Sequence, residues 1–385
     1  MYNFDEPFDR HGTDSMKWDR LFAAYGREDM IPMGLADMDF KTLPEAAEAI
    51  QMRAAHPCYG YTYQPEEYYE SFTGWNRRRN HLEIKKEEII GVPGIVCAAS
   101  IVLMALTKPG DRILLCTPVY DPFFTVIREL ERVLVTSQLL ETKEGYRFDF
   151  EDMEQKMQEG VQLLILCSPH NPVGRVWTRD ELLRISELCR KYHVLVFSDD
   201  IHSDFILREN PYIPMAAVSE DAASRTVTAM SPSKTFNVSG LKTSVIFTRN
   251  PELFSRINRI KRAFHLGVGL FGITGLTAAY CRGDRYVVEL CAYIRKNAEY
   301  AARYIQQEIP AVKAYVPEGT YFLWLDCRAL DLPQKALVDR VIQAGVIPNN
   351  GSQYGPGGEG FIRLNLATRT AMVKEAMERL RTALV

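Results

Sequence analysis

The sequence contains no long hydrophobic run and no marked excess of charge. None of its apolar stretches approaches the roughly 18 residues that a membrane-spanning helix requires. In the 385-residue chain, 46 basic and 49 acidic residues give a formal net charge of −3, whereas nucleic acids and anionic membranes bind proteins with clustered positive charge. The short basic run at 77–79 is interpreted as one solvated face of a helix. We therefore expect neither a nucleic-acid partner nor a membrane.

Patterns typical of secretion, disulfide bonding and metal binding are absent as well. The N-terminal segment, MYNFDEPFDRHG, is acidic and lacks the apolar core of a signal peptide. The eight cysteines form no C-x-x-C pair, and the seven histidines form no H-E-x-x-H motif. Cys116 and Cys167 lie inside apolar runs, as small buried thiols do in a reducing compartment. We expect a cytoplasmic protein without a metal site.

The middle of the chain alternates short β-rich runs with helical patterns. The run VQLLILCS at 161–168 is apolar almost throughout, as in a strand that is buried on both faces. Thr178 and Glu181 have the spacing of a capping box at the start of a helix over 178–192, and a further helix is expected over 122–132. Strands that alternate with such helices predict β-α-β crossovers and a mostly parallel sheet covered by helices. The predicted strands are 112–117, 133–137, 161–168, 194–198, 226–230 and 244–248.

The two ends of the chain have a different pattern. Residues 1–47 are rich in turns, and a long helical pattern over 286–308 is followed by strand-like pieces and a final helix. We predict an α/β protein with a large domain over 48–285. A smaller α+β domain is predicted to form from 1–47 and 286–385.

Polar residues follow four of the predicted strands directly. They are Tyr120, Asn171, Asp199 with His202, and Lys234. Ligands of open parallel sheets bind outside the carboxyl ends of the strands. These side chains are therefore expected to line one site.

Lys234 lies in the segment S-P-S-K-T-F after an apolar strand. Burial at the end of a strand would lower its pKa and free the amine as a nucleophile. Ser231, Ser233 and the backbone N–H groups around them suit a phosphate, to which Lys242 could add a positive charge. A surface lysine in a loop rich in serine and threonine is the alternative.

Four further residues each have a chemical and a structural interpretation, and one loop has a chemical one. Asp199 could pair with a pyridinium N–H, or cap the turn that follows its strand. The amide of Asn171 could donate to a phenolic oxygen, or the segment PHNPVG could be only a turn. Tyr120 could lie flat against a planar cofactor or belong to the core. Arg363, in an apolar strand, could bind a carboxylate or form an internal salt bridge. The loop GVPGIV at 91–96 opens a helix and offers N–H groups to an anion.

Taken together, these segments resemble the fold-type I pyridoxal-phosphate enzymes of the aspartate aminotransferase superfamily. The resemblance is greatest to the cystathionine β-lyase-like C–S lyases of the MalY/PatB type. Asp200, Ser168 and Val92 depart from the pattern of that subgroup, which leaves the substrate open. The matching segments run in the family's order over nearly the whole chain: LADMDF (35–40), YGYT (59–62), PGIV (93–96), TPVYDPF (117–123), CSPHNPVGRVW (167–177), SDDIHSD (198–204), SPSKTFNVSGLK (231–242), EGTYFLW (318–324) and FIRLNLA (361–367).

The resemblance implies a role for each site residue. Lys234 would hold pyridoxal 5'-phosphate as a Schiff base, Asp199 would pair with the ring nitrogen, and Arg363 would bind the substrate carboxylate. Tyr61 would reach the site of the neighbouring subunit in a homodimer, and Tyr61, Tyr120 and Lys234 would be the catalytic residues. The other implied contacts are Tyr120 stacked on the ring, Asn171 and His202 at its phenolic oxygen, Ile95, Val96, Ser231, Ser233, Lys242 and Tyr61 at the phosphate, and Ala36, Asp37 and Asn171 beside the substrate.

The implied reaction is β-elimination from a small amino acid, namely L-cystathionine, L-cysteine or a related S-conjugate, to a thiol, pyruvate and ammonia. An aminotransferase of class I/II is the first alternative, because it shares the cofactor and the first steps. The segment from Ser231 to Lys234 also matches the S-x-x-K pattern of serine acyl-transfer enzymes, but neither S-D-N nor K-T-G accompanies it. A non-catalytic regulator that binds the cofactor or an amino acid is the third alternative.

Overall fold

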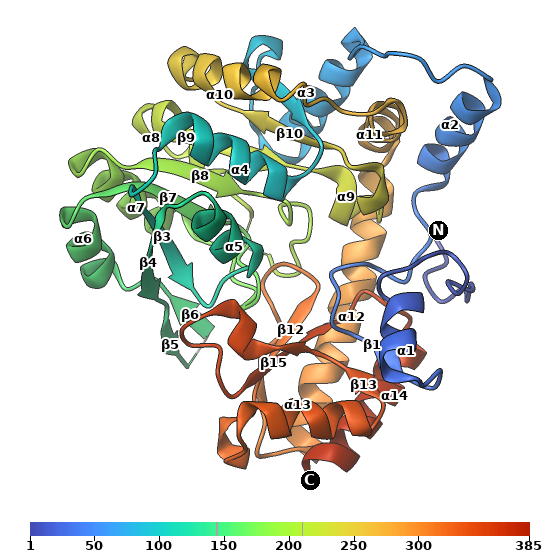
Figure 1. The fold of residues 1–385 in the computed structure, drawn as a ribbon. Helices are drawn as coiled ribbons and strands as arrows, with labels where there is room; N and C mark the ends of the chain where they lie inside the picture. Colours follow the sequence, from blue (N-terminus) through green and yellow to red (C-terminus); the bar gives the residue numbers. More distant parts are fainter. Residues whose placement is uncertain (144, 210) are drawn as a thin grey trace.

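The centre of the fold is a seven-stranded sheet, called the central sheet below, with the strand order β2-β10-β9-β8-β7-β3-β4. The structure is a computed structural model, and it describes residues 1–143, 145–209 and 211–385 (Figure 1). The strands from β9 to β4 in this order pair in parallel, and β10 is antiparallel to both of its neighbours. The predicted α/β fold with a mostly parallel sheet is confirmed. The strands are β2 (Ile89–Val92), β3 (Arg112–Thr117), β4 (Val133–Gln138), β7 (Val161–Cys167), β8 (Leu195–Asp199), β9 (Thr226–Met230) and β10 (Ser244–Phe247).

Side chains along the central strands alternate between two apolar layers, as the period of a strand requires. In β3, Ile113 and Leu115 belong to the layer that contains α4, α5 and α10, whereas Leu114 and Cys116 belong to the layer of α6, α7 and α8. Helices therefore cover both faces of the sheet (Figure 1). Their bounds are α4 (Ile95–Leu106), α5 (Pro122–Glu129), α6 (Phe150–Gln158), α7 (Arg179–Lys191), α8 (Glu220–Arg225) and α10 (Pro251–Ala263).

Local sequence signals set several helix ends. Thr178 and Glu181 form the predicted capping box at the start of α7. Helix α5 ends at Glu129 rather than at residue 132. Glu131 has a φ of +59°, which an α-helix does not allow, and the chain turns there into β4.

A second helical layer consists of α2 (Pro44–Ala55), α3 (Glu66–Asn80) and α11 (Leu270–Arg282), in which α11 packs on both of the others. The basic run lies at the end of α3. Arg77 is exposed and pairs with Glu83. Arg79 instead lies over the ring of Trp75, at 5.0 Å from its centroid, and donates to the buried Asp204 at 3.1 Å. The interpretation of this run as one solvated face is therefore wrong for Arg79.

A four-stranded sheet, called the C-terminal sheet below, has the order β11-β12-β15-β14. One face carries Leu323, Leu325, Ile362 and Leu364, which pack in one core with α12, α13 and α14. The opposite face carries the alternate residues, Arg363 among them. The elements are β11 (Lys313–Ala314), β12 (Phe322–Asp326), β14 (Asn349–Asn350), β15 (Phe361–Asn365), α12 (Asp284–Glu308), α13 (Gln334–Gln343) and α14 (Thr370–Leu384).

The N-terminal segment joins this C-terminal part of the fold. Strand β1 (Ile31–Pro32) pairs in parallel with β13 (Val346–Ile347), and α1 (Asp19–Tyr25) precedes it. Helix α12 runs without a break across the predicted boundary at residue 285, from α11 to the C-terminal sheet (Figure 1). The division into two domains stays a prediction.

Within the described parts of the chain, no helix combines the length and the apolar character needed to cross a membrane. All eight cysteines are free thiols.

Candidate active site

Two adjoining cavities lie at the carboxyl ends of the parallel strands. The inner cavity has a volume of about 30 Å³, and the outer one has a volume of about 550 Å³. Ala36, Tyr120 and Lys234 line both. The inner cavity is also lined by Ile95, Cys167, Asn171, Asp199, Ile201 and His202, and the outer one by Asp37, Lys242, Tyr354 and Arg363 among others. The strand ends that the sequence analysis singled out therefore meet at one place.

Lys234 reaches the cavities from α9 (Pro232–Thr235), a short helix directly after β9. Ser231 begins this helix, and its Oγ accepts from the backbone N–H of Ser233 at 3.1 Å. Nζ of Lys234 donates to the carbonyl oxygen of Ala36 at 2.7 Å. Burial lowers the pKa of Lys234 to about 8, although the nearby carboxylate of Asp37 opposes this shift. Lys234 is thus an enclosed amine, and its interpretation as a surface lysine is wrong.

Ser231 and Lys234 do not form the pair that a serine nucleophile would need. Ser231 Oγ donates to the carbonyl oxygen of Thr243 at 2.7 Å and lies 2.9 Å from Ser233 Oγ. Because Nζ of Lys234 is directed at Ala36, the hydroxyl has no base beside it. This geometry argues against the serine acyl-transfer alternative.

Two neighbouring carboxyl groups at the end of β8 lie in different surroundings. Asp200 accepts hydrogen bonds from Ser198 Oγ (2.5 Å) and from the hydroxyl of Tyr212. Asp199 lines the inner cavity and accepts only from the backbone N–H of Ile201, at 3.2 Å, among the described residues. Burial raises the pKa of each carboxyl group to about 7. Asp199 therefore caps its turn and also presents an oxygen that lacks a cationic partner.

His202 and Tyr120 form two walls of the inner cavity. The ring of His202 packs edge-on against Tyr321 and Phe322, with centroid distances of 5.5 and 5.3 Å. Burial holds the pKa of His202 well below its usual value, and Lys234 acts in the same direction, so the imidazole is neutral. Its buried Nδ1 has no hydrogen-bond partner among the described residues.

Arg363 is buried in β15, yet no carboxylate in the described chain pairs with it. Its Nη1 donates to Asn171 Oδ1 at 2.8 Å, and its Nη2 donates to the carbonyl oxygen of Gly34 at 2.7 Å and to Asn349 Oδ1 at 2.5 Å. The guanidinium lies 3.8 Å from the ring centroid of Phe322. Neutral acceptors fix the group and leave its charge uncompensated, and Nε has no hydrogen-bond partner among the residues that the structure describes. The interpretation as an internal salt bridge is wrong.

Backbone N–H groups at the start of α4 face the same region. Ile95 is the first residue of this helix and lines the inner cavity, and no side chain caps the helix at Gly94. Uncapped N–H groups at a helix start attract anions. Val96 follows in the first turn, and Lys242 lines the outer cavity nearby.

Two predicted residues differ in setting from the others. Asp37 lines the outer cavity, but both of its oxygens accept from Arg10, at 3.1 and 2.9 Å. Tyr61 is fully exposed, in the extended stretch between α2 and α3, and lines neither cavity. Val96, Ser231 and Ser233 also line neither cavity and only lie near lining residues along the chain, whereas every other predicted site residue lines one or both cavities.

Of the residues that accept hydrogen bonds from Arg363, the sequence analysis predicted only Asn171 as a site residue and missed the others. Gly34 and Asn349 accept its hydrogen bonds, and the ring of Tyr354 lies 5.2 Å from its guanidinium. Asn349 could have been found from the polar pair Asn349–Asn350 after the apolar run at 346–347. Gly34 contributes only its carbonyl group, which leaves no signal in the sequence.

Comparisons with known proteins agree with this geometry. The family model of aminotransferase class I and II matches residues 28–380. The cystathionine β-lyase PatB of Bacillus subtilis (strain 168) is 39% identical over 390 aligned residues, which cover 99% of this chain and 100% of that protein. Cystalysin from Treponema denticola, whose structure contains pyridoxal 5'-phosphate, is 33% identical with a TM-score of 0.96, covering 100% and 99% of the two chains. A pyridoxal-phosphate-bound C–S lyase from Staphylococcus hominis is 30% identical with a TM-score of 0.93, covering 100% and 98%.

Proposed function

Because the chain belongs to the aminotransferase class I and II family, and its full-length relatives include carbon–sulfur lyases, we propose that it releases a thiol from a sulfur-containing amino acid by β-elimination. The predictions of the family, of pyridoxal 5'-phosphate as the cofactor and of a carbon–sulfur β-lyase are confirmed by these comparisons. The roles of individual residues and the identity of the amino acid are part of the proposal.

The chemistry of the two cavities taken together fits pyridoxal 5'-phosphate. Lys234 would hold its aldehyde carbon. Asp199, a buried carboxyl group that pairs with no cation of the described chain, would hold the ring N–H. His202 offers a buried ring nitrogen that has no hydrogen-bond partner in the described parts of the chain, and with Asn171 it would contact the phenolic oxygen. Tyr120 would cover the ring. The phosphate would be held by the start of α4 (Ile95, Val96) with Ser231, Ser233 and Lys242.

When bound, the cofactor withdraws electrons from the substrate Cα and so makes its proton acidic. Arg363 supplies the site for the substrate carboxylate, since its charge has no partner in the described chain. This uncompensated charge beside Lys234 is the observation that supports an amino-acid substrate most directly. A carboxylate fixed at Arg363 orients the Cα–H bond toward the amine of Lys234.

Lys234 is the proposed base that takes the Cα proton. In the chain without cofactor, burial lowers its pKa to about 8, so the site disfavours the charged form of the amine. The carbonyl oxygen of Ala36, which accepts from Nζ at 2.7 Å, holds the amine at the border of the two cavities. Loss of the proton is followed by rupture of the Cβ–S bond, and the sulfur leaves as a thiol with the proton that Lys234 returns. Water then converts the remaining three-carbon fragment into pyruvate and ammonia.

The outer cavity would receive the substrate. Its volume of about 550 Å³ must hold most of the cofactor as well, because the inner cavity has only about 30 Å³. The paired side chains of Arg10 and Asp37 form part of its wall. We propose L-cystathionine, L-cysteine or a related S-conjugate as the substrate, beside Ala36 and Asp37.

A homodimer is part of the same proposal. Tyr61 and Tyr63 are exposed, and Tyr59 is half exposed, on one segment between α2 and α3. Such a group of aromatic side chains on the surface favours burial against another subunit. We propose that Tyr61 contacts the phosphate of the neighbouring subunit. A cytosolic location is proposed as well, because all eight cysteines are free.

The dimer proposal can be tested by mixing two inactive variants. If Tyr61 acts in the neighbouring site, a mixed dimer of Tyr61→Ala and Lys234→Ala contains one site in which neither residue is changed. Mixing should then restore lyase activity that both variants lack alone. Activity of Tyr61→Ala on its own, or no recovery in mixed dimers isolated by two affinity tags, would contradict the shared site.

The reaction can be tested with purified holoenzyme and L-cystathionine in the absence of any keto acid. Pyruvate should form continuously, whereas the Lys234→Ala variant should form none. L-Alanine with 2-oxoglutarate serves as the matched aminotransferase assay, because alanine has no leaving group on Cβ. Pyruvate formation that depends on added keto acid would refute the lyase and favour an aminotransferase.

A further inference from the structure

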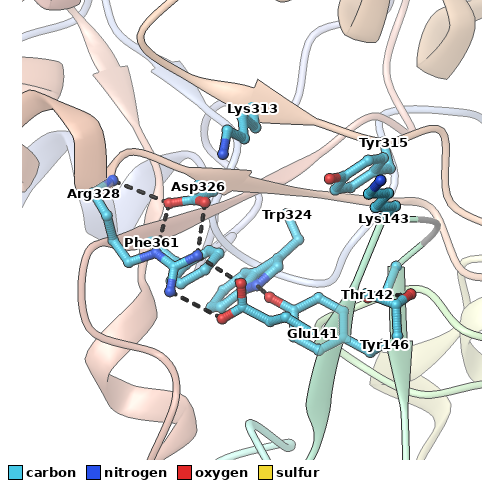
Figure 2. A pocket seen from close by; sticks show the side chains of 11 residues that line it. Glu141, Thr142, Lys143, Tyr146, Lys313, Tyr315, Trp324, Asp326, Arg328 and Phe361 are labelled. Atoms are coloured by element: carbon cyan, nitrogen blue, oxygen red, sulfur yellow. Dashed lines mark hydrogen bonds and ion pairs between the residues drawn. The ribbon is translucent and has the colours of Figure 1, made fainter.

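A two-stranded hairpin, separate from the central sheet, packs on the C-terminal sheet close to the strand of Arg363. It consists of β5 (Leu140–Thr142) and β6 (Gly145–Arg147), which pair in antiparallel fashion. Figure 2 shows the ring of Tyr146 from this hairpin beside the indole of Trp324 from β12. Trp324 Nε1 donates to the hydroxyl of Tyr146 at 3.1 Å, and both side chains are only 7% exposed. The two sheets are thus joined by one buried hydrogen bond.

Ion pairs reinforce this contact on two sides. Arg328 donates to Glu141 of the hairpin at 3.0 and 2.6 Å, and to Asp326 of β12 at 2.9 and 2.8 Å (Figure 2). On the other side, Arg175 donates to the carbonyl oxygen of Tyr146 and to Glu318 at 2.8 Å. The hairpin is therefore held in place, and Tyr146 offers Trp324 an acceptor at a fixed position.

Trp324 is in turn connected to Arg363 in two ways. Trp324 and Arg363 are direct partners across β12 and β15, and two aromatic rings also link them. The indole stacks on Phe361 at a centroid distance of 4.9 Å with an interplanar angle of 7°, and it meets Tyr354 edge-on at 5.5 Å. Tyr354 lies 5.2 Å from the guanidinium of Arg363, and Phe361 precedes Arg363 by two residues on the same face of β15. One indole thus supports both the strand and the ring beside Arg363.

We propose that Tyr146 and Trp324 are positioning residues for Arg363, which hold its guanidinium where the substrate carboxylate binds. The proposal rests on the carboxylate role of Arg363 given above. A buried indole N–H that loses its acceptor remains unsatisfied. Its most direct remedy is a shift of the ring toward water, and that shift would displace Tyr354 and Phe361. Small displacements of a binding group have large effects on a ligand that must align with a second group.

The test compares two ligands on the Tyr146→Phe holoenzyme. L-Alanine presents an amine and a carboxylate, whereas ethylamine presents the amine alone, and neither has a leaving group. The dissociation constant of L-alanine, measured by calorimetry, should rise roughly fivefold to tenfold, the order of one lost buried hydrogen bond. The dissociation constant of ethylamine and the visible absorption spectrum of the bound cofactor should stay unchanged.

Tyr192→Phe is the matched control. Its hydroxyl donates to Glu154 at 3.1 Å, on the face of the central sheet covered by α6 and α7. It should leave the affinity for both ligands unchanged. A loss of thermal stability in Tyr146→Phe with unchanged affinity for L-alanine would reduce Tyr146 to a structural role and overturn the proposal. An equal loss of affinity for both ligands would overturn it as well, because Arg363 contacts only the carboxylate.

Trp324→Phe provides a second route if Tyr146→Phe does not fold. It keeps an aromatic ring against Phe361 and removes only the N–H and part of the indole, so the same selective loss of L-alanine affinity is expected. The test is independent of the reaction catalysed, because L-alanine binds without elimination. If the unchanged protein forms no pyruvate from cystathionine but Tyr146→Phe still loses affinity for L-alanine, the proposed reaction is wrong and this inference holds.

Discussion

In the apoenzyme, Lys234 should react with an aldehyde much faster at neutral pH than an ordinary lysine does. Only the unprotonated amine is a nucleophile, and burial lowers the pKa of Lys234 from 10.5 to about 8. At pH 7 the unprotonated fraction is then roughly 1 in 10, compared with roughly 1 in 3,000 for an ordinary lysine, a ratio of about 300. Because the pKa is lowered, the rate should reach half of its maximum near pH 8 and fall about tenfold for each pH unit well below that.

The measurement is the rate of imine formation when apoenzyme is mixed rapidly with pyridoxal 5'-phosphate at a series of pH values. The same reaction with a blocked lysine derivative gives a reference, and the ratio of the two rates removes the ionisation of the cofactor itself. Lys234→Arg should abolish the fast phase. Asp37→Asn should move the half-maximum to lower pH, because the Asp37 carboxylate raises the pKa of Lys234. A half-maximum at pH 10 or above in the unchanged protein would refute the argument from burial.

Substitutions at three further positions test the site and its support. In a fluorescence titration, Asp199→Asn should lower the affinity of the apoenzyme for pyridoxal 5'-phosphate by roughly 30-fold or more, as the loss of a buried charge pair does. An unchanged affinity would contradict the pairing of Asp199 with the ring nitrogen. Arg363→Lys should raise KM for L-cystathionine by roughly tenfold, since an ammonium cannot reproduce the planar fork of hydrogen bonds, and kinetics that leave KM unchanged would exclude the carboxylate role. Asp204 accepts from Trp75 Nε1 at 3.2 Å and from Thr235 Oγ1 at 2.7 Å. Asp204→Ala should therefore lower the free energy of unfolding, measured in guanidinium, by about 3 kcal/mol. Asp204→Asn should lower it by less, and equal losses of stability in the two variants would argue against these hydrogen bonds.

Much of the central sheet could be predicted because its signals are local. The bounds of β3 and β9 agree with the predicted strands 112–117 and 226–230, since turn residues bracket short runs of apolar side chains there. Once these strands are parallel, their carboxyl ends must share one edge. Asn171, Asp199 and Lys234 could therefore be assigned to one site before any contact was known.

The residues around Arg363 could not be predicted in the same way, because they come from separate parts of the chain. Gly34, Asn171, Asn349 and Tyr354 meet at this side chain only after both sheets have formed. The β5–β6 hairpin was missed for a related reason. Each of its strands has three residues, too few to show an alternation of apolar and polar side chains. Its deeply buried side chain, Tyr146, accepts a hydrogen bond from Trp324, a residue that is distant in the sequence.

The electrostatics of the site explain why its separate interpretations from sequence converge. Asp199 and Lys234 are both held toward their neutral forms by burial, and Arg363 keeps a charge that no carboxylate of the described chain balances. A fold stabilised only by its own contacts would pair such groups with one another, since buried groups without partners cost free energy. Here each group instead faces a cavity. A ring N–H for Asp199, an aldehyde for Lys234 and a carboxylate for Arg363 would relieve all three, and the combination of cofactor and amino acid supplies them together.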